Sequence, residues 1–459
     1  MAKIVIIGAG LTGISAAYHL EQKGFCDYAI FERDAKIGGL CGTVQQNGFT
    51  FDFTGHYLHA SDPYFRSMIE SLVGMDNLNT VVRKSFIYSH NTYTNYPFQI
   101  NLFGLPTEVI AECIEGFVKR DKANKKIQTF PEWVMHNFGA GFGKHFFFPF
   151  QRKIFGYDLK KISSSWTGRF VPSTSLQQII EGSIRPADDT MVGYNASFLY
   201  PKQGGIVFWV QKIADQLKNP IHTNFSVTSI DMKQKIVTFA NGHNEPFEQL
   251  ISTMPLDVLL KSLQERSSTN LRNAAKNLVC NSVINFNLGV NRPELSDKHW
   301  IYFPESHYPF YRLGFPSNCA ASMAPAGCSS LYGEFSHVNK SKAWVQQTLR
   351  DSLKTTKQLF KISDTEILIQ KTMPISHAYV IYDQWREKNL PKLHKQLETE
   401  SVYSVGRYGE WKYSSMQEAV LDGKKIAETL TVIPARQLNK EIEFVPMRST
   451  SKQREIETP

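Results

Sequence analysis

The sequence has no long apolar run. None of its 459 residues lies in a stretch of 18 or more apolar residues, so no membrane-spanning helix is predicted. The N-terminus enters a strand-like pattern at once, without the charged and apolar regions of a signal peptide. We therefore expect a cytoplasmic protein with no integral membrane segment.

Cysteine is scarce, and its spacing argues against two kinds of site. The six cysteines form no C-x-x-C pair, which is not the pattern of a zinc centre or a disulfide framework. No other cluster of His, Cys, Asp and Glu has ligand spacing, so we predict no metal site.

Patterns typical of nucleic-acid binding are missing as well. The sequence shows no helix-turn-helix, zinc-finger or RNA-binding signature, so a nucleic-acid partner is not expected. The net charge of +9 then has two interpretations, a solvated basic surface or attraction for an anionic ligand such as a phosphorylated substrate.

The strongest signal is a glycine loop near the N-terminus. An apolar strand pattern at residues 4–7 leads into G-x-G-x-x-G, which reads Gly8-Ala9-Gly10-Leu11-Thr12-Gly13. Residues 11–23 then carry apolar side chains at helical spacing. In this context Gly8 allows a tight turn, Gly10 lets the backbone approach a pyrophosphate, and Gly13 lets helix and strand pack closely. The N–H groups that open the helix would bind the phosphates.

An acidic residue and a second glycine pair narrow the choice of dinucleotide. Glu32 ends the second predicted strand, nineteen residues after Gly13, where a carboxylate can accept hydrogen bonds from a ribose diol and disfavours NADP. The segment 34–43 contains Gly38 and Gly39 and resembles the D-x-x-x-x-G-G segment of the FAD-containing amine oxidase and UDP-galactopyranose mutase superfamily. The resemblance implies FAD, contacted by Gly8, Gly10, Leu11, Thr12, Gly13, Glu32, Arg33, Gly38, Gly39 and Leu40.

Other segments resemble the UDP-galactopyranose mutase-like branch of that superfamily more narrowly. Residues 51–59 resemble its glycine-proline-histidine loop, which implies that His56 and His59 lie at the flavin. Residues 96–102 resemble its Tyr-Pro-x-Pro-Ile-Asn-Leu segment. Val227 matches a position where the superfamily passes backbone by the adenine.

Segments in the C-terminal part of the chain also resemble this branch. Residues 406–416 resemble a Gly-Arg-x-x-x-Tyr-x-Tyr-x-x-Met signature, which implies that Arg407 and Met416 contact the cofactor and that Tyr413 faces substrate phosphates. Tyr382 belongs to a segment that resembles the family's Tyr-x-x-x-Asp.

Two substrate positions depart from the family pattern. Phe155 stands where the mutases commonly carry Trp, and Ser173 replaces the second arginine of an Arg-x-x-x-Arg pair whose first member is Arg169. Serine cannot replace the paired hydrogen bonds of arginine to phosphate, so these departures indicate a relative with a different substrate. The catalytic residues implied by the resemblance are His59, Arg169, Tyr382 and Tyr413.

The expected fold class is α/β, or α+β for the chain as a whole. A Rossmann-type FAD-binding domain would carry a helical insert and a substrate domain with a mixed or antiparallel sheet. The alternation at residues 221–230 and 236–240 predicts two strands around a polar turn. The expected division is a discontinuous FAD-binding domain (1–75, 200–275 and 395–432), the insert (76–199), the substrate domain (276–394) and a polar C-terminal extension (433–459).

The sequence leaves more than one activity open. The mutase-like resemblance implies an isomerase that acts on a nucleoside diphosphate sugar through reduced flavin. The alternative is an FAD-dependent oxidoreductase of the amine oxidase or protoporphyrinogen oxidase type, which the Phe- and Tyr-rich middle of the chain favours. A non-catalytic flavoprotein fits poorly with a full set of cofactor motifs. A small-molecule partner is expected in either enzyme, and a homodimer is compatible with the sequence.

Overall fold

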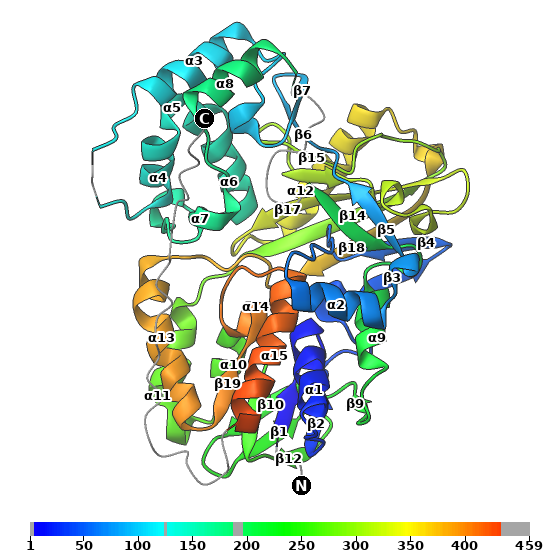
Figure 1. Ribbon diagram of the computed structural model, residues 1–459, viewed down its shortest axis with the longest axis vertical. Coiled ribbons are helices and arrows are strands. Elements are labelled where there is room, and N and C mark those ends of the chain that lie inside the picture. Colours follow the sequence, from blue (N-terminus) through cyan, green and yellow to red (C-terminus); the bar gives the residue numbers. More distant parts are fainter. Residues whose placement is uncertain (1–3, 124–125, 187–195, 433–459) are drawn as a thin grey trace, which may run out of the picture.

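A parallel sheet of five strands contains the N-terminal strand (Figure 1). The computed structural model describes residues 4–123, 126–186 and 196–432, so the expected C-terminal extension lies outside the described residues. Stretches far apart in the sequence meet in this sheet, because it combines, in spatial order, β19 (Val402–Ser404), β13 (Gln249–Ser252), β1 (Ile4–Ile7), β2 (Tyr28–Phe31) and β9 (Ile221–His222).

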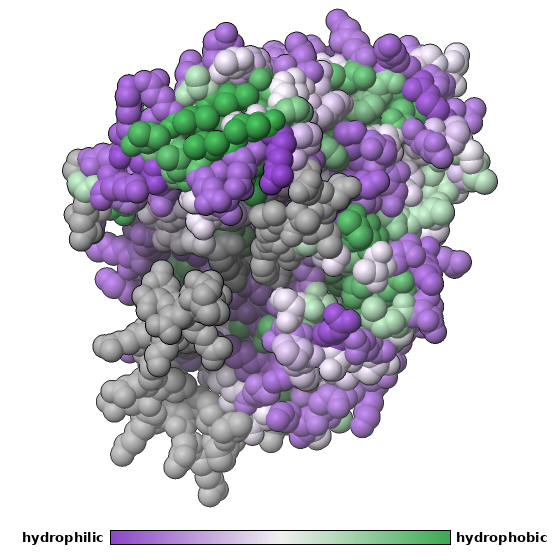
Figure 2. Space-filling view, turned by 45° about the horizontal axis from the view of Figure 1, so that its top comes forward, coloured by the Kyte–Doolittle hydropathy of each residue, from purple (hydrophilic) through white to green (hydrophobic). Residues whose placement is uncertain are grey.

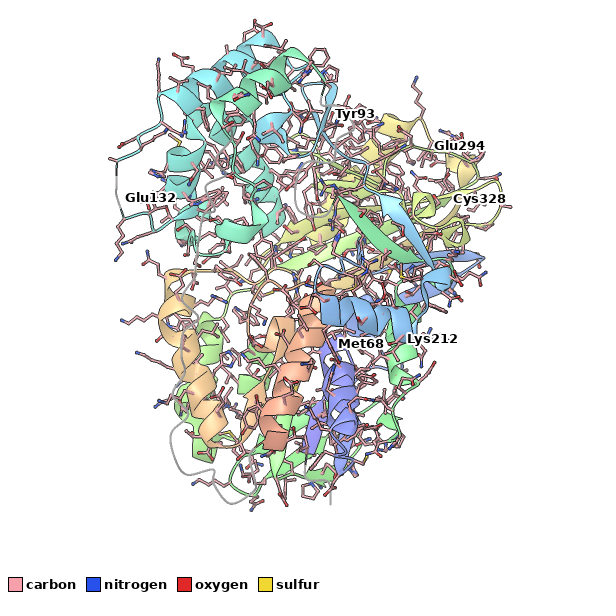
Figure 3. The ribbon with its side chains drawn as sticks, in the orientation of Figure 1. Met68, Tyr93, Glu132, Lys212, Glu294 and Cys328 are labelled. Atoms are coloured by element: carbon pink, nitrogen blue, oxygen red, sulfur yellow. The ribbon has the colours of Figure 1, made fainter. Side chains whose placement is uncertain are left out.

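Helix α1 (Leu11–Gln22) follows β1 and packs against α15 (Met416–Val432). The two helices approach closely because Gly423 has no side chain, and a Cβ atom there would lie 2.6 Å from the Thr12 carbonyl oxygen. Nearby are α2 (Pro63–Leu72) and α9 (Val207–Ala214). Met68 of α2 belongs to the same buried apolar cluster as residues of α1 (Figure 3).

A second sheet has seven strands and is almost wholly antiparallel. Its order is β18 (Ile367–Ile375), β14 (Ser282–Val290), β17 (Ser329–His337), β16 (Arg312–Gly314), β15 (Trp300–Tyr302), β6 (Ser85–Ser89) and β7 (Thr92–Asn95). Side chains alternate between its faces. Residues such as Phe286 and Leu313 pack toward α12 (Lys342–Phe360), so the opposite face, with Arg312, is left for the cavity described below.

The helical part of the chain forms the upper left of the molecule in Figure 1. Its core is rich in phenylalanine, including Phe98, Phe138 and Phe142. A Cβ atom at Gly141 would lie 2.1 Å from the Glu112 carbonyl oxygen, so glycine is what lets two of the helices touch. The helices are α3 (Thr107–Val118), α4 (Phe130–Asn137), α5 (Gly139–Phe142), α6 (Phe148–Phe155), α7 (Thr167–Phe170) and α8 (Leu176–Ile184).

The segment 221–230 differs from the expected single strand. It is divided into β9 of the parallel sheet and β10 (Val227–Asp231), which joins a separate antiparallel sheet with β11 (Ile236–Phe239) and β12 (Asn244–Pro246). Asn224 has a left-handed φ of 64°, which interrupts the extended chain. After this break the Phe225 N–H donates to the Glu32 carbonyl oxygen at 2.8 Å, so the segment returns to the end of β2.

The mixed architecture, with a parallel sheet, a helical part and an antiparallel sheet, confirms the predicted fold class. Within the described ranges, no helix combines the length and the apolar character that a bilayer crossing requires.

Candidate active site

The loop between β1 and α1 has the geometry that its glycines predict. Gly8 has a φ of 101°, and a Cβ atom there would lie 2.2 Å from Thr253 Oγ1. At Gly13 an added Cβ would lie 1.9 Å from the Gly8 carbonyl oxygen, whereas at Gly10 it would meet no atom within 4 Å. No side chain caps the N-terminus of α1. The N–H groups that open α1 therefore have no side-chain cap, which is the arrangement that binds a diphosphate.

Glu32 and the second glycine pair surround the same loop. The buried Glu32 carboxylate accepts hydrogen bonds from the N–H groups of Ala9 (2.7 Å) and Asp34 (2.9 Å). Gly38 donates its N–H to the Ala9 carbonyl at 2.8 Å, and a Cβ at Gly39 would be 3.5 Å from Gly10 Cα. The sequence places these residues apart, and the fold brings them together as one cradle.

Arg33 and Val227, two other residues expected to contact the cofactor, lie outside the glycine loop. The Arg33 side chain is largely exposed and pairs with Asp34 at 3.3 Å. Val227 begins β10, two residues after Phe225 bonds to the backbone at Glu32. This neighbourhood fits the ribose and adenine end of a dinucleotide.

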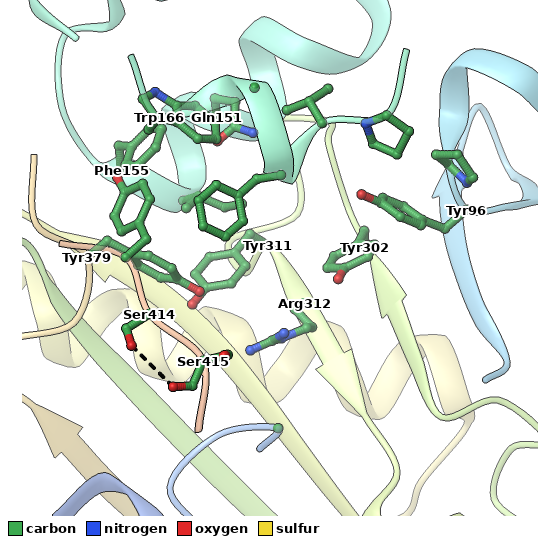
Figure 4. A pocket seen from close by; sticks show the side chains of 18 of the residues that line it. Tyr96, Gln151, Phe155, Trp166, Tyr302, Tyr311, Arg312, Tyr379, Ser414 and Ser415 are labelled. Carbon is green, nitrogen blue, oxygen red and sulfur yellow. Dashed lines mark hydrogen bonds between the residues drawn. The ribbon is translucent and has the colours of Figure 1, made fainter. Parts of the chain in front are cut away.

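A cavity of ≈ 1370 Å³ lies between the parallel-sheet loops, the helical part and the seven-stranded sheet (Figure 4). Leu40, His56, His59, Arg407 and Met416, all expected at the cofactor or the reaction centre, line it. Within the described residues, no group of three or more His, Cys, Asp or Glu side chains is arranged to hold a metal ion.

The two loop histidines are neutral at physiological pH. Burial, assisted by the nearby Arg407 guanidinium, lowers the pKa of His56 to about 4. Burial also lowers the pKa of His59 to about 4. Both imidazoles can therefore donate or accept hydrogen bonds at the cavity wall without adding charge there.

These pKa shifts predict a loss of stability in acid. In the unfolded chain histidines take up protons near pH 6.5, whereas His56 and His59 in the folded protein do so only near pH 4. The unfolded state thus binds more protons between these values, and the free energy of unfolding falls as the pH drops from 6.5 to 4. We expect the His56→Gln/His59→Gln variant to lose roughly 5 kcal/mol less than the unsubstituted protein over this range. Urea unfolding at several pH values measures it, and an equal loss in both proteins would contradict it.

Arg407 is held by backbone carbonyl groups. Its guanidinium donates to the carbonyl oxygens of Ser414 (2.7 Å) and Ala378 (3.2 Å). These bonds connect the residues after β19 to the end of the seven-stranded sheet, and they fix the positive charge at the cavity wall. Gly406 has a φ of 80°, and a Cβ there would lie 2.6 Å from Thr12 Oγ1, so the Arg407 turn packs directly on the start of α1.

Tyr413 is the centre of an aromatic cluster on the cavity wall. Its ring lies 4.6 Å from that of Tyr382, 5.8 Å from Trp166 and 5.9 Å from Phe170, between centroids. The Tyr413 hydroxyl is buried and has no hydrogen-bond partner among the described residues. Burial raises the pKa of Tyr413 well above its usual range, so the hydroxyl stays protonated and able to donate.

Tyr382 lies behind Tyr413 and does not line the cavity. Its hydroxyl oxygen accepts the Tyr413 N–H at 2.9 Å, and the Arg386 guanidinium lies 3.6 Å from the centre of the Tyr382 ring. The structure therefore places Tyr382 where it can orient Tyr413 rather than touch a ligand in the cavity.

The end of α6, the helix α7 and the residues after α7 border the cavity. Arg169 belongs to α7, and its neighbours Gly168 and Phe170 line the cavity, as does Ser173. Phe155, in place of the expected Trp, also lines it, with its ring centre 6.4 Å from that of Tyr413.

Several lining residues had no signal in the sequence. Arg83 lies in the link between β5 (Leu78–Val82) and β6, and Arg120 and Lys122 follow α3. No motif surrounds these residues, and only the tertiary arrangement brings them to the cavity. Arg312, on β16, donates two hydrogen bonds to the buried Glu334 carboxylate, at 2.8 and 3.0 Å.

Known proteins resemble the chain over most of its length. A solved structure of reduced UDP-galactopyranose mutase has a TM-score of 0.86 and 26% sequence identity, with 94% of each chain covered. A putative protoporphyrinogen oxidase from Exiguobacterium sp. 255-15 shares the fold, with a TM-score of 0.72 and 14% identity over 94% of this chain and 99% of that one. The 4,4'-diapolycopene oxygenase of Methylomonas sp is 23% identical over 390 residues, which are 71% of this chain and 73% of the relative.

The sequence profile of one family extends across the cradle, the cavity and the C-terminal helix. The family is described as flavin containing amine oxidoreductase, and its profile matches residues 11–431. The glycine cradle, the uncapped start of α1 and the open space at Gly10 fit FAD. The chain is thus an FAD-dependent enzyme, and it belongs to the flavin-containing amine oxidoreductase family.

Proposed function

We propose that the protein is a mutase-like isomerase whose substrate is a nucleoside diphosphate sugar or a related glycan precursor. The observation that carries this proposal is the charge of the cavity wall. Glu418 is the one acidic side chain among the described residues that line the cavity, whereas the basic ones are Arg83, Arg120, Lys122, Arg407 and Arg312, the last of which is neutralised by the buried Glu334. An excess of fixed positive charge favours a substrate that carries phosphate.

The likeness to known structures supports the same proposal. The UDP-galactopyranose mutase structure matches at a TM-score of 0.86, against 0.72 for the putative protoporphyrinogen oxidase, at equal coverage of this chain. Phe155 and Ser173, which depart from the family pattern, line the cavity. We propose that they distinguish the substrate of this protein from that of UDP-galactopyranose mutase.

Each residue has a role in this proposal. Arg169 binds a substrate phosphate, and the Tyr413 hydroxyl donates to a second phosphate oxygen. Tyr382 holds Tyr413 in place through the N–H that it accepts. His59, which is neutral, orients the ring system or the sugar. FAD, when bound in its reduced form, supplies an electron-rich ring to the anomeric carbon, and the surrounding side chains hold that carbon in position.

A second candidate function rests on the aromatic wall. Thirteen of the residues that line the cavity are Phe, Tyr or Trp, which suits an apolar donor and an oxidoreductase of the amine oxidase or protoporphyrinogen oxidase type. The two candidates differ in the redox state of the flavin that binds the substrate.

A titration in both redox states tests the proposal. The purified protein, with FAD bound, would be reduced with dithionite and titrated with UDP- and TDP-sugars while the flavin spectrum is recorded. We expect a sugar nucleotide to perturb the reduced flavin, and Arg169→Ala or Tyr413→Phe to weaken its binding about tenfold to a hundredfold without loss of FAD. Arg350→Ala, an exposed change on α12, is the charge-matched control for Arg169→Ala.

Two results would overturn the proposal. One is unchanged sugar-nucleotide binding in both variants. The other is a flavin that no sugar nucleotide perturbs in either redox state but that an amine or a porphyrinogen bleaches when oxidised, which would assign the oxidoreductase activity.

We also propose the domain boundaries, the cytoplasmic location and the homodimer that the sequence leads us to expect. Light scattering of the purified protein at several concentrations tests the homodimer, and a constant monomer mass would exclude it.

A further inference from the structure

The active-site cavity has two ends that differ in their side chains. Figure 4 shows Phe155 and Trp166 on one side of the cavity and Tyr96 on the other. Tyr413 belongs to the first side, because its ring centre lies 6.4 Å from that of Phe155 and 5.8 Å from that of Trp166. We call the other side the Tyr96 end, and the lining residues that form it are Tyr96, Arg83, His59, Trp300 and Tyr302.

An arginine stands at the Tyr96 end. The Arg83 guanidinium carbon lies 5.5 Å from the centre of the Tyr96 ring, and the Arg83 side chain is half-buried. The Arg83 N–H donates to the Ala196 carbonyl oxygen at 3.0 Å, which holds the link between β5 and β6 in place. Burial lowers the pKa of His59, and the Arg83 charge lowers it further. The fold thus brings one positive charge to the side of the cavity away from Tyr413.

No acidic side chain lies at the Tyr96 end among the described residues that line the cavity. Glu418, the one acid in that wall, accepts the Ser415 N–H at 2.7 Å. Figure 4 places Ser415 on the other side of Arg312 from Tyr96. The described wall at the Tyr96 end is therefore positive, and it favours an anionic group on the ligand.

Hydrogen-bond donors surround this charge. The rings of Tyr96 and Tyr302 lie 5.5 Å apart between centroids, and Figure 4 shows both side chains projecting into the cavity. Burial raises the pKa of Tyr96 above its usual range, so its hydroxyl stays protonated and able to donate. His59 Nδ1 and Trp300 Nε1 are buried and have no hydrogen-bond partner among the described residues. Buried polar atoms are nearly always paired, so this end suits a ligand that supplies oxygen atoms.

The cavity is open to a charged ligand. Lys122 and Phe170, which line it, are exposed to solvent, so the cavity opens beside the helical part. Figure 2 shows a hollow in the surface below that part. A highly charged molecule needs such an opening, because it does not pass through packed apolar side chains.

The proposed function decides which part of the substrate meets Arg83. The phosphates lie at Tyr413 in that proposal, and the reacting sugar must meet the flavin, which His59 is expected to contact. His59 belongs to the Tyr96 end, so the sugar extends toward Arg83. A neutral sugar would cover the guanidinium without neutralising it, whereas a carboxylate would form charge-assisted hydrogen bonds with it.

We infer that the Tyr96 end binds a carboxylate on the sugar, so that the substrate is a nucleoside diphosphate sugar acid. Arg83 binds the carboxylate, and the Tyr96 and Tyr302 hydroxyls donate to it. This inference rests on the proposed function and names the class of sugar within it. Arg83 is then the residue that distinguishes an acidic sugar from a neutral one.

Two sugar nucleotides that differ at one carbon test the inference. The full-length protein with FAD bound would be reduced with dithionite and titrated with UDP-galacturonate and with UDP-galactose, and the flavin spectrum gives each affinity. The test variant is Arg83→Gln. The matched control is Lys84→Gln, which removes the same charge at the next residue, where the side chain is exposed and does not line the cavity. Flavin absorbance reports that each variant has folded.

We expect the unsubstituted protein and Lys84→Gln to bind UDP-galacturonate about tenfold to a hundredfold more tightly than UDP-galactose, and Arg83→Gln to lose this preference. Equal binding of the two sugar nucleotides by the unsubstituted protein would overturn the inference and leave the proposed function intact. A preference that survives in Arg83→Gln would overturn the role of Arg83. Binding of neither sugar nucleotide would overturn the proposed function and the inference with it.

Discussion

Replacing Gly10 with alanine is expected to lower the affinity for FAD by roughly a hundredfold while leaving the stability of the FAD-free protein unchanged. Gly10 has a φ of −74°, which any residue adopts, and an added Cβ meets no protein atom within 4 Å. The methyl group would instead occupy the space beside the start of α1 that a bound pyrophosphate needs. Flavin fluorescence titration measures the affinity, and thermal unfolding after removal of FAD measures the stability.

Gly13→Ala is the matched comparison, because the same methyl group is added three residues away. Here the Cβ would lie 1.9 Å from the Gly8 carbonyl oxygen, so α1 must shift from β1, and the FAD-free protein itself should lose about 3 kcal/mol or more. Equal FAD affinity in Gly10→Ala and the unsubstituted protein would show that the loop does not hold the diphosphate. Equal stability of all three FAD-free proteins would contradict the close packing at Gly13.

The second large effect is expected at the ion pair beneath the cavity. Glu334→Ala should lower the free energy of unfolding by about 3–5 kcal/mol, because it leaves the Arg312 charge buried without its partner. The Glu334 side chain is fully buried and accepts two hydrogen bonds from Arg312, at 2.8 and 3.0 Å. Urea unfolding of the purified variant measures the loss.

A double variant distinguishes the cost of leaving a buried charge unpaired from the cost of lost packing. Replacing both residues with apolar ones, as Arg312→Met/Glu334→Leu, removes the unpaired charge and should recover more than half of the loss. A double variant as unstable as Glu334→Ala would indicate that the packing of the strands, and not the charge, accounts for the effect. A loss below about 1 kcal/mol in Glu334→Ala would place the pair in the class of weak surface ion pairs.

The dinucleotide cradle could be predicted because its signals are local. Gly8, Gly10 and Gly13 are close in sequence, and the strand before them and the helix after them have clear apolar periods. In the structure Gly8 and Gly13 make the close contacts that exclude a side chain, and Glu32 follows at the end of β2. Backbone conformation and steric contact within about thirty residues decide this part of the fold.

The Arg312–Glu334 pair could not be predicted in the same way. The two residues are opposite each other only because of the register between β16 and β17, and nothing near either residue in the sequence specifies that register. Arg83, Arg120 and Lys122 reach the cavity from links and helix ends, where side-chain direction depends on tertiary packing.

The division of residues 221–230 into two strands could not be predicted from the sequence either. The alternation of side chains fits an extended chain throughout, but Asn224 takes a left-handed conformation and the two halves join different sheets. A pattern of alternation does not reveal which partner strand each residue finds.

Because α1 packs against α15, and β19 lies in the same sheet as β1, the enzyme can become active only late in its synthesis. A ribosome releases the glycine loop early, but β19, Arg407 and α15, which packs against α1, are among the last described parts to be made. A nascent chain that has not reached Met416 contains the loop for the diphosphate without the wall that completes the cavity. Products of premature termination therefore lack a complete active site, and only a chain finished through α15 can become the enzyme.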